Sequence, residues 1–177
     1  QYLESAGGTD IFLARYTADG ELVWAQRAGG EYDDRFHDMD GFPDGSVLLS
    51  GTFDGTAGFG EGDDGTTLSS TAGETYFMAR HAPDGALDWA RSIVRVGTTN
   101  KEGLARVAVL DDGAQLMAAW YNGDITLGSG EPNETVLVAT GKNLPVFLAR
   151  FEADGTLGWA KLHGHGRPLA ISAFEDG

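Results

Sequence analysis

The chain has 177 residues, 41% of them hydrophobic and 10% aromatic, with no cysteine and a formal net charge of −15. This apolar content excludes a disordered chain, and the absence of cysteine excludes a disulfide framework. The negative charge disfavours nucleic acid and anionic membranes as partners, because both would be repelled. The longest apolar runs, at 116–121 and 144–149, fall far short of the ~20 residues that a membrane-spanning helix needs.

A hairpin motif occurs three times along the chain. Segments 11–16, 76–81 and 146–151 read IFLARY, YFMARH and VFLARF, and each is followed by an Asp-Gly turn and then a Trp-Ala pair. The tryptophans are Trp24, Trp89 and Trp159, spaced by 65 and 70 residues. This register defines one repeat domain over 1–177, with units 1–65 and 66–135 and an incomplete unit 136–177.

Each unit is predicted to contain short strands. In the first unit, segments 12–16 and 22–26 flank the turn Asp19-Gly20, and segments 36–42 and 47–53 flank Asp44-Gly45. Asp-Gly between apolar segments is a strong hairpin signal. We therefore expect four strands per unit, arranged as two hairpins, and almost no helix.

Tandem four-stranded units predict an all-β fold of β-propeller-type antiparallel blades, since stacked blades bury faces that a single blade leaves exposed. The third unit stops where its fourth strand is expected, which gives about two and three-quarter blades. Closed propellers have about 4–8 blades. We therefore expect a partial or fragment propeller, which further blades of the same protein or of a partner chain would complete.

The repeat pattern resembles the bacterial β-propeller repeat family, found in large secreted or surface proteins. The matching residues are Asp10, Phe12, Trp24, Gly29, Gly30, Gly45, Gly51, Phe59 and Gly60. The resemblance covers essentially the whole chain, although unit two has Ala119 in place of Gly51 and no clear counterpart of Gly29-Gly30. It implies a propeller architecture and a location outside the cell or in the cell envelope, and it supplies no catalytic residue.

The third strand of each unit has a constant face and a variable face. The constant positions are apolar (Met39, Val107 and Ile171), so we expect them in the core. The alternate positions differ between units (Asp38, Arg106 and Ala170, then Asp40, Ala108 and Ser172), so this face is free to specialise. Arg106 is a candidate for an ion pair with Asp38 between blades or for contact with a partner.

Two further sets of side chains recur. The repeated tryptophans are interpreted as blade-to-blade packing, with a sugar-binding surface as the alternative. Trp120 replaces Thr52 of unit one, stands outside this framework, and is a candidate partner contact. We expect the repeated arginines to pair with the turn aspartates four residues later; the pairs are Arg15–Asp19, Arg80–Asp84 and Arg150–Asp154.

The acidic residues are concentrated in the first unit, where residues 1–65 hold 14 acidic and 3 basic side chains. Carboxylates on glycine-rich loops suit calcium, which takes 6–8 oxygen ligands. The candidate ligands are Asp33, Asp34, Asp38, Asp40, Glu61, Asp63 and Asp64. The alternative is a solvated acidic surface without metal. His163 and His165 are a further candidate pair for a metal, or simply loop histidines.

No sequence motif of a catalytic site is present. The sequence therefore predicts a non-catalytic extracellular or cell-surface scaffold that binds a protein or glycan partner and needs no cofactor. The alternatives are a calcium-stabilised adhesion module and part of a propeller enzyme acting on glycans.

Overall fold

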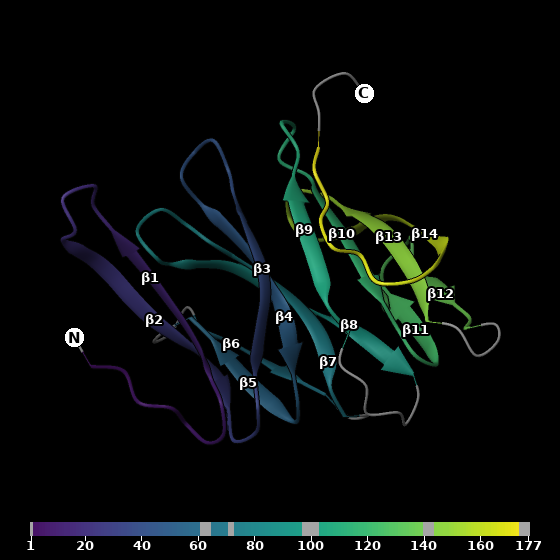
Figure 1. Ribbon diagram of the computed structural model, residues 1–177, viewed down its shortest axis with the longest axis horizontal. Coiled ribbons are helices and arrows are strands. Elements are labelled where there is room, and N and C mark those ends of the chain that lie inside the picture. Colours follow the sequence, from purple (N-terminus) through teal and green to yellow (C-terminus); the bar gives the residue numbers. More distant parts are fainter. Residues whose placement is uncertain (1, 61–64, 71–72, 97–102, 140–143, 174–177) are drawn as a thin grey trace.

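The computed structural model describes the whole chain except residues 1, 61–64, 71–72, 97–102, 140–143 and 174–177 (Figure 1). The described residues contain strands and no helix, which confirms the predicted all-β class. The strands are β1 (Ile11–Tyr16), β2 (Leu22–Gly30), β3 (Arg35–Gly41), β4 (Val47–Phe53), β5 (Thr56–Phe59), β6 (Thr66–Ser69), β7 (Thr75–His81), β8 (Leu87–Val96), β9 (Ala105–Val109), β10 (Gln115–Trp120), β11 (Asp124–Leu127), β12 (Thr135–Leu137), β13 (Pro145–Phe151) and β14 (Leu157–His165). Within these residues, nothing forms a helix long and apolar enough to cross a membrane.

The strands form three sheets that lie in a row (Figure 1). The first sheet has the order β1-β2-β5-β6, the second β12-β11-β8-β7-β4-β3, and the third β14-β13-β10-β9. All strand pairs are antiparallel. The second and third sheets share one four-stranded arrangement, because β3-β4-β7-β8 corresponds in order to β9-β10-β13-β14.

Each sequence unit is divided between neighbouring sheets. In the first unit, the β1-β2 hairpin lies in the first sheet, whereas the β3-β4 hairpin lies in the second. There β4 pairs with β7 of the next unit, from Val47 opposite His81 to Phe53 opposite Thr75. In the same way, β10 pairs with β13. A four-stranded sheet therefore combines the second hairpin of one unit with the first hairpin of the next.

The prediction of four strands per unit was wrong. Two further short hairpins, β5-β6 and β11-β12, extend across the boundaries at which units one and two end. In these hairpins, β5 pairs with β2 and β11 pairs with β8. Their strands have only three or four residues, too few for an alternating pattern to be recognised. Gly55 and Gly60, which flank β5, have φ of +62° and +77°, a conformation that favours glycine.

The core lies between the sheets, in two clusters. One cluster, between the first and second sheets, includes Ile11, Phe59 and Phe77. The other, between the second and third sheets, includes Met78 and Phe147. Strand β4 contributes to both clusters, because it lies in the middle sheet and is covered on both faces. This double burial explains why six of the seven residues of VLLSGTF are buried, on both faces of the strand.

In units two and three, the turn of the first hairpin contacts the tryptophan of the preceding unit. Trp24 Nε1 donates a hydrogen bond to the carbonyl of Pro83 at 3.0 Å, and Gln26 Nε2 donates to that of Gly85 at 2.7 Å. One unit later, Trp89 Nε1 donates to Ala153 at 3.2 Å. The tryptophans at these two positions therefore connect neighbouring sheets, as their interpretation as packing residues requires.

The repeated arginines have different partners from those predicted. Arg80 pairs with Asp44 at 2.9 Å, and Arg150 pairs with Asp112 at 2.6 Å. Both aspartates belong to the turn of the neighbouring hairpin in the same sheet, because β4 and β10 lie beside β7 and β13. The prediction that each arginine pairs with the aspartate four residues later was wrong, since strand pairing between units brings a different turn closer.

The expected core position Met39 is exposed. Val107, at the equivalent position of the next unit, is buried and packs in the core between the second and third sheets. Met39 is 46% exposed because, among the described strands, the first sheet consists of β1, β2, β5 and β6, and none of these covers that face of β3 as β9 and β10 would. Ile171 is partly buried. The prediction of a uniform core face therefore holds for Val107 and fails for Met39.

The contact between turn and tryptophan can be tested by comparing Gly85→Ala with Gly20→Ala. Both glycines have a positive φ in equivalent turns, so both changes carry a similar backbone strain of about 1–2 kcal/mol. A Cβ on Gly85 would lie 2.9 Å from Trp24, whereas one on Gly20 has no neighbour within 4 Å. We expect Gly85→Ala to lower the free energy of unfolding by about 1–3 kcal/mol more, as measured by denaturant titration. Equal losses would contradict the contact.

Candidate functional site

Strand β3, at the edge of the second sheet, and strand β9, at the edge of the third, are joined by side-chain hydrogen bonds and not by backbone pairing. Three alternate amides of β9 donate hydrogen bonds to side chains of β3. These bonds run from Ala105 N to His37 Nδ1 (3.2 Å), from Val107 N to Asp38 Oδ2 (3.1 Å) and from Val109 N to Asp40 Oδ2 (2.9 Å). The amides on this edge of β9 are thereby satisfied, although the two strands belong to different sheets.

The partners of His37 define its tautomer. Its Nδ1 accepts a hydrogen bond from the Ala105 amide, and its Nε2 lies 3.5 Å from Thr52 Oγ1. The Thr52 hydroxyl itself donates to Glu74 at 2.6 Å. His37 is therefore held with its proton on Nε2, directed at Thr52. In this arrangement His37 acts as a structural link between the two sheets.

Arg106, on β9, forms hydrogen bonds that connect β9 with β3 and with segment 169–173. Its Nη1 donates to the carbonyl of His37 at 3.0 Å, and its Nε donates to the carbonyl of Leu169 at 2.8 Å. The predicted ion pair with Asp38 is not among its contacts with the described residues. Segment 169–173 thus lies beside β9 much as β9 lies beside β3, which agrees with their equivalent places in the repeat.

A hollow of about 610 Å³ opens between these inner segments. It is lined by parts of β3, β9 and segment 169–173, including Asp38, Asp40, Arg106 and Ser172. Ligand pockets in proteins typically measure about 300–1,000 Å³. The variable positions of the third strands therefore meet at one polar hollow of ligand size, which the sequence pattern alone did not reveal.

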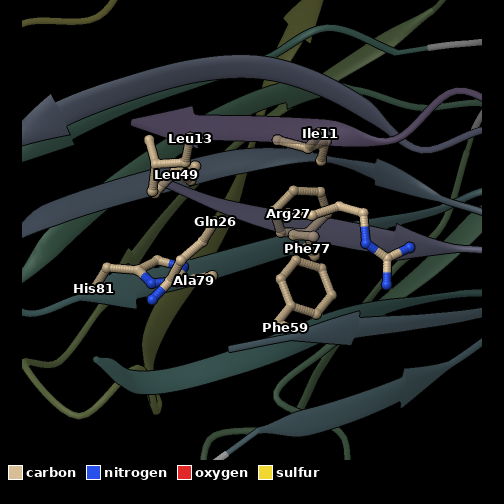
Figure 2. A pocket seen from close by; sticks show the side chains of 10 residues that line it. Ile11, Leu13, Gln26, Arg27, Leu49, Phe59, Phe77, Ala79 and His81 are labelled. Atoms are coloured by element: carbon tan, nitrogen blue, oxygen red, sulfur yellow. The ribbon is translucent and has the colours of Figure 1, made fainter. Parts of the chain in front are cut away.

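A second opening, between the first and second sheets, is too small for a ligand. Figure 2 shows its lining, which includes Ile11, Phe59, Phe77 and His81. Its volume is about 10 Å³, close to the minimum for a single water molecule. Burial lowers the pKa of His81, whose Nδ1 lies 3.2 Å from the carbonyl of Gly85. This void belongs to the core.

The candidate calcium ligands are dispersed by the fold. Asp38 and Asp40 face β9, Asp34 is buried, and Asp33 accepts a hydrogen bond from the amide of Thr9. Glu61, Asp63 and Asp64 lie outside the described residues. Among the residues that the structure describes, no three His, Cys, Asp or Glu side chains gather in a way that could hold a metal ion.

An acidic cleft of about 460 Å³ lies near the β2–β3 connection. Its lining includes Glu31, Asp33, Asp54 and Glu74, with the guanidinium of Arg35 among them. Arg35 lies 3.5 Å from Asp33 and 3.6 Å from Glu74, so it offsets part of the negative charge. Such partly exposed pairs contribute about 0–1 kcal/mol each.

Asp34 forms a buried carboxyl pair with Asp10, a partner that the sequence did not suggest. A Cβ on Gly29 would lie 2.5 Å from Asp10 Oδ1 and 2.7 Å from Asp34 Oδ2, so only glycine leaves room for both carboxyls. Asp34 is 1% exposed, and its Oδ2 accepts a hydrogen bond from the amide of Gly30 at 2.7 Å. Burial and the neighbouring carboxyl of Asp10 raise the pKa of Asp34 to about 6.

Asp10 remains the ionised member of this pair. Burial alone would raise its pKa, but hydrogen bonds from the Ala6 amide and from Arg27 lower the pKa below its ordinary value. The guanidinium of Arg27 lies 2.9 Å from Asp10 Oδ2. Oδ1 of Asp10 and Oδ1 of Asp34 are buried without a partner when no carboxyl proton is counted. A proton on Asp34 supplies the missing donor.

The remaining candidates occupy different environments. Trp120 is only 3% exposed, and the guanidinium carbon of Arg167 lies over the indole ring of Trp120, 5.5 Å from the ring centroid. Trp120 is therefore not a free contact surface. Its burial follows from its place in β10, in the interior of the third sheet. His163 and His165 are exposed on β14, and Trp159 is partly buried.

Comparisons with known proteins supply no family. No protein-family model matches the chain, and no curated protein matches it.

The buried carboxyl pair predicts an unusual pH dependence, which Asp34→Asn removes. The native pKa of Asp34 is about 6 and its ordinary value is 3.8, so the folded state binds more protons between these values. Relative to Asp34→Asn, we expect the wild type to lose about 2 kcal/mol of unfolding free energy as pH rises from 4 to 7. Denaturant titrations at several pH values measure this difference.

Asp111→Asn is the control, because it removes the same charge from an exposed carboxyl in the β9–β10 turn, whereas the charge of Asp33 itself contributes to the raised pKa of Asp34. It should leave the pH profile parallel to that of the wild type. If Asp34→Asn also gave a parallel profile, the protonated carboxyl pair would be refuted.

Proposed function

We propose that this protein is a non-catalytic scaffold of β-propeller-type blades, working outside the cell or in the cell envelope, that binds a glycan partner in the hollow between its inner strands. The observation that carries the proposal is the meeting of variable repeat positions at this hollow of about 610 Å³. The repeated four-stranded order of the second and third sheets supports the blade architecture. The resemblance to propeller repeats in secreted and surface proteins supports the location.

The chemistry of the hollow favours a glycan over a flat protein surface. Asp38 and Asp40 bring carboxylate acceptors, whose lone pairs can accept beyond their bonds to β9, and Ser172 brings a hydroxyl. Arg106 brings a guanidinium with five N–H donors, of which the two on Nη2 are available besides the Nε and Nη1 groups that bond to backbone carbonyls. Closely spaced donors and acceptors in a concave site match the hydroxyls of a sugar.

A binding role without a chemical step fits the positions of these groups. The two aspartates and His37 are engaged with backbone amides of β9, so their side chains serve to hold the strands together. An acid–base mechanism would require these groups to exchange protons with a substrate. A protein partner and a glycan-active enzyme remain the outcomes against which the proposal is tested.

Binding is tested on a glycan array with Ala170→Trp. Ala170 is exposed and lines the hollow, so an indole there should fill the space and abolish glycan binding without disturbing the core. Ala86→Trp, at an exposed turn residue away from the hollow, is the control and should bind like the wild type. No glycan binding by the wild type, equal binding by both variants, or turnover of a bound glycan would contradict the proposal.

The calcium-stabilised alternative is tested by thermal unfolding with calcium and then with a chelator. Since the described carboxylates do not form a metal-binding group, we expect the midpoint to stay within about 1 °C. A calcium-dependent increase of several degrees, reversed by the chelator, would favour the adhesion module. Magnesium at the same concentration controls for general screening of the negative charge.

A further inference from the structure

We propose that copies of this chain associate head to tail, with the hairpin turn 17–20 of one copy docking on Trp159 and Lys161 of another. The proposal is independent of the glycan site. It extends an interface that occurs twice inside the chain and whose two halves lie, without partners among the described residues, at opposite ends of the row of sheets (Figure 1).

The receiving half of the interface is a tryptophan with a donor two residues later. The pair Trp24 and Gln26 receives the turn of unit two, and both side chains donate to its backbone carbonyls. The pair Trp89 and Arg91 receives the turn of unit three, where Arg91 Nε donates to Asp154 at 3.2 Å. The third such pair is Trp159 and Lys161, in which the ammonium lies 5.2 Å from the indole ring.

The docking half is a turn of the same conformation in all three units. In each unit the glycine amide donates to the carbonyl three residues earlier, with Gly20, Gly85 and Gly155 at φ of +84°, +95° and +78°. Gly85 and Gly155 are buried against the tryptophan of the preceding unit. Gly20 has no neighbour within 4 Å, and the turn around it is exposed. The first turn is therefore preformed and unoccupied.

The sheet face behind this turn is apolar and uncovered. Phe12 is 62% exposed, whereas Phe77 and Phe147, at the equivalent positions, are 1% and 0% exposed. Tyr16 is likewise 57% exposed, and its equivalent Phe151 is buried. The buried members pack against the preceding sheet, and no described strand packs in this way against Phe12 and Tyr16. Exposed aromatic residues grouped in this way are typical of an interaction surface.

The two ends also differ in charge. Residues 1–65 carry 14 acidic and 3 basic side chains, whereas residues 144–173 carry two acidic and three basic ones. The turn itself contains Asp19, which would approach the ammonium of Lys161. Attraction between the ends favours head-to-tail pairing over contact between two acidic ends.

Such an interface joins different surfaces of the two copies, so each dimer keeps one free turn and one free tryptophan. Further copies can then be added at the free ends. The assembly stops growing only if the rotation between successive copies brings the two free ends together and closes a ring. The expected signature is therefore a molar mass that rises with concentration, without stopping at the dimer.

The experiment measures molar mass by sedimentation and light scattering over a concentration series of the wild type. Trp159→Ala should weaken association roughly 30-fold, because a central tryptophan is typical of interface hot spots. Phe12→Glu should weaken it similarly. Met39→Glu changes an exposed apolar residue on β3, in the middle sheet, and should associate like the wild type.

A mixture of Trp159→Ala and Phe12→Glu provides the decisive test. Each variant keeps one intact half, so the mixture should form a 1:1 dimer that grows no further, whereas each variant alone stays monomeric. A wild type that remains monomeric at every concentration would overturn the proposal. So would a mixture that fails to pair, since contact between like surfaces predicts no complementation.

If Trp159→Ala fails to fold, two substitutions of the exposed Lys161 test the same contact. Lys161→Gln places at this site the residue that already performs the role at Gln26, so association should be retained within about threefold. Lys161→Glu removes the donor and repels Asp19, and it should weaken association at least about tenfold. Equal association by the two variants would overturn the assigned contact.

Discussion

The row of sheets depends on the contact between each hairpin turn and the tryptophan of the preceding unit. Trp24 and Trp89 each donate to a turn carbonyl about sixty residues later, and a glycine without a side chain lets the turn approach the indole. This contact fixes the distance and rotation between successive sheets at their outer ends. Because it joins consecutive units, it can be repeated along the chain without any change in the units themselves.

The division of each unit between two sheets has an energetic consequence. Since β4 pairs with β7 and β10 pairs with β13, a single unit can complete neither its sheet nor its core. The folding of one unit therefore requires the next, as in other repeat architectures where neighbours supply the buried surface. Met39 shows the same dependence from the other side, because it is exposed where the first sheet offers no inner hairpin.

The inner side of the row is held together differently, by polar side chains. His37, Asp38 and Asp40 satisfy three amides along the edge of β9. An edge strand with unpaired amides invites pairing with other chains, and these bonds remove that possibility here. The same carboxylates line the hollow, so one set of side chains both closes a sheet edge and gives the hollow its polar character.

The first unit combines its excess of acid with a carboxyl that is partly neutralised by burial. Asp34 meets Asp10 beside Gly29, where a proton on one carboxyl is more favourable than two buried charges. The formal charge of the unit therefore overstates its charge in the folded state near the pKa of Asp34. The acidic end remains strongly negative, through exposed residues such as Asp19 and Glu31.

Local sequence patterns were enough to predict the all-β class, the positions of the main hairpins and the repeated tryptophans. These features depend on local patterns, since Asp19-Gly20 or Asp44-Gly45 between apolar segments produces a turn wherever the chain places it. The short hairpins β5-β6 and β11-β12 escaped prediction because strands of three or four residues carry too little pattern.

Which surfaces meet depends on how the sheets pack, and this could not be predicted from the sequence. Asp10 and Asp34 are 24 residues apart, and Asp38 accepts a hydrogen bond from an amide 69 residues away. Neither pairing produces a recognisable pattern in the local sequence. Trp120 looked like a surface residue because it departs from the repeat, yet its place in β10 buries it. The equivalent residues Phe12 and Phe77 lie in similar local sequences and have opposite exposures, because burial is set by the neighbouring sheet and not by the strand itself.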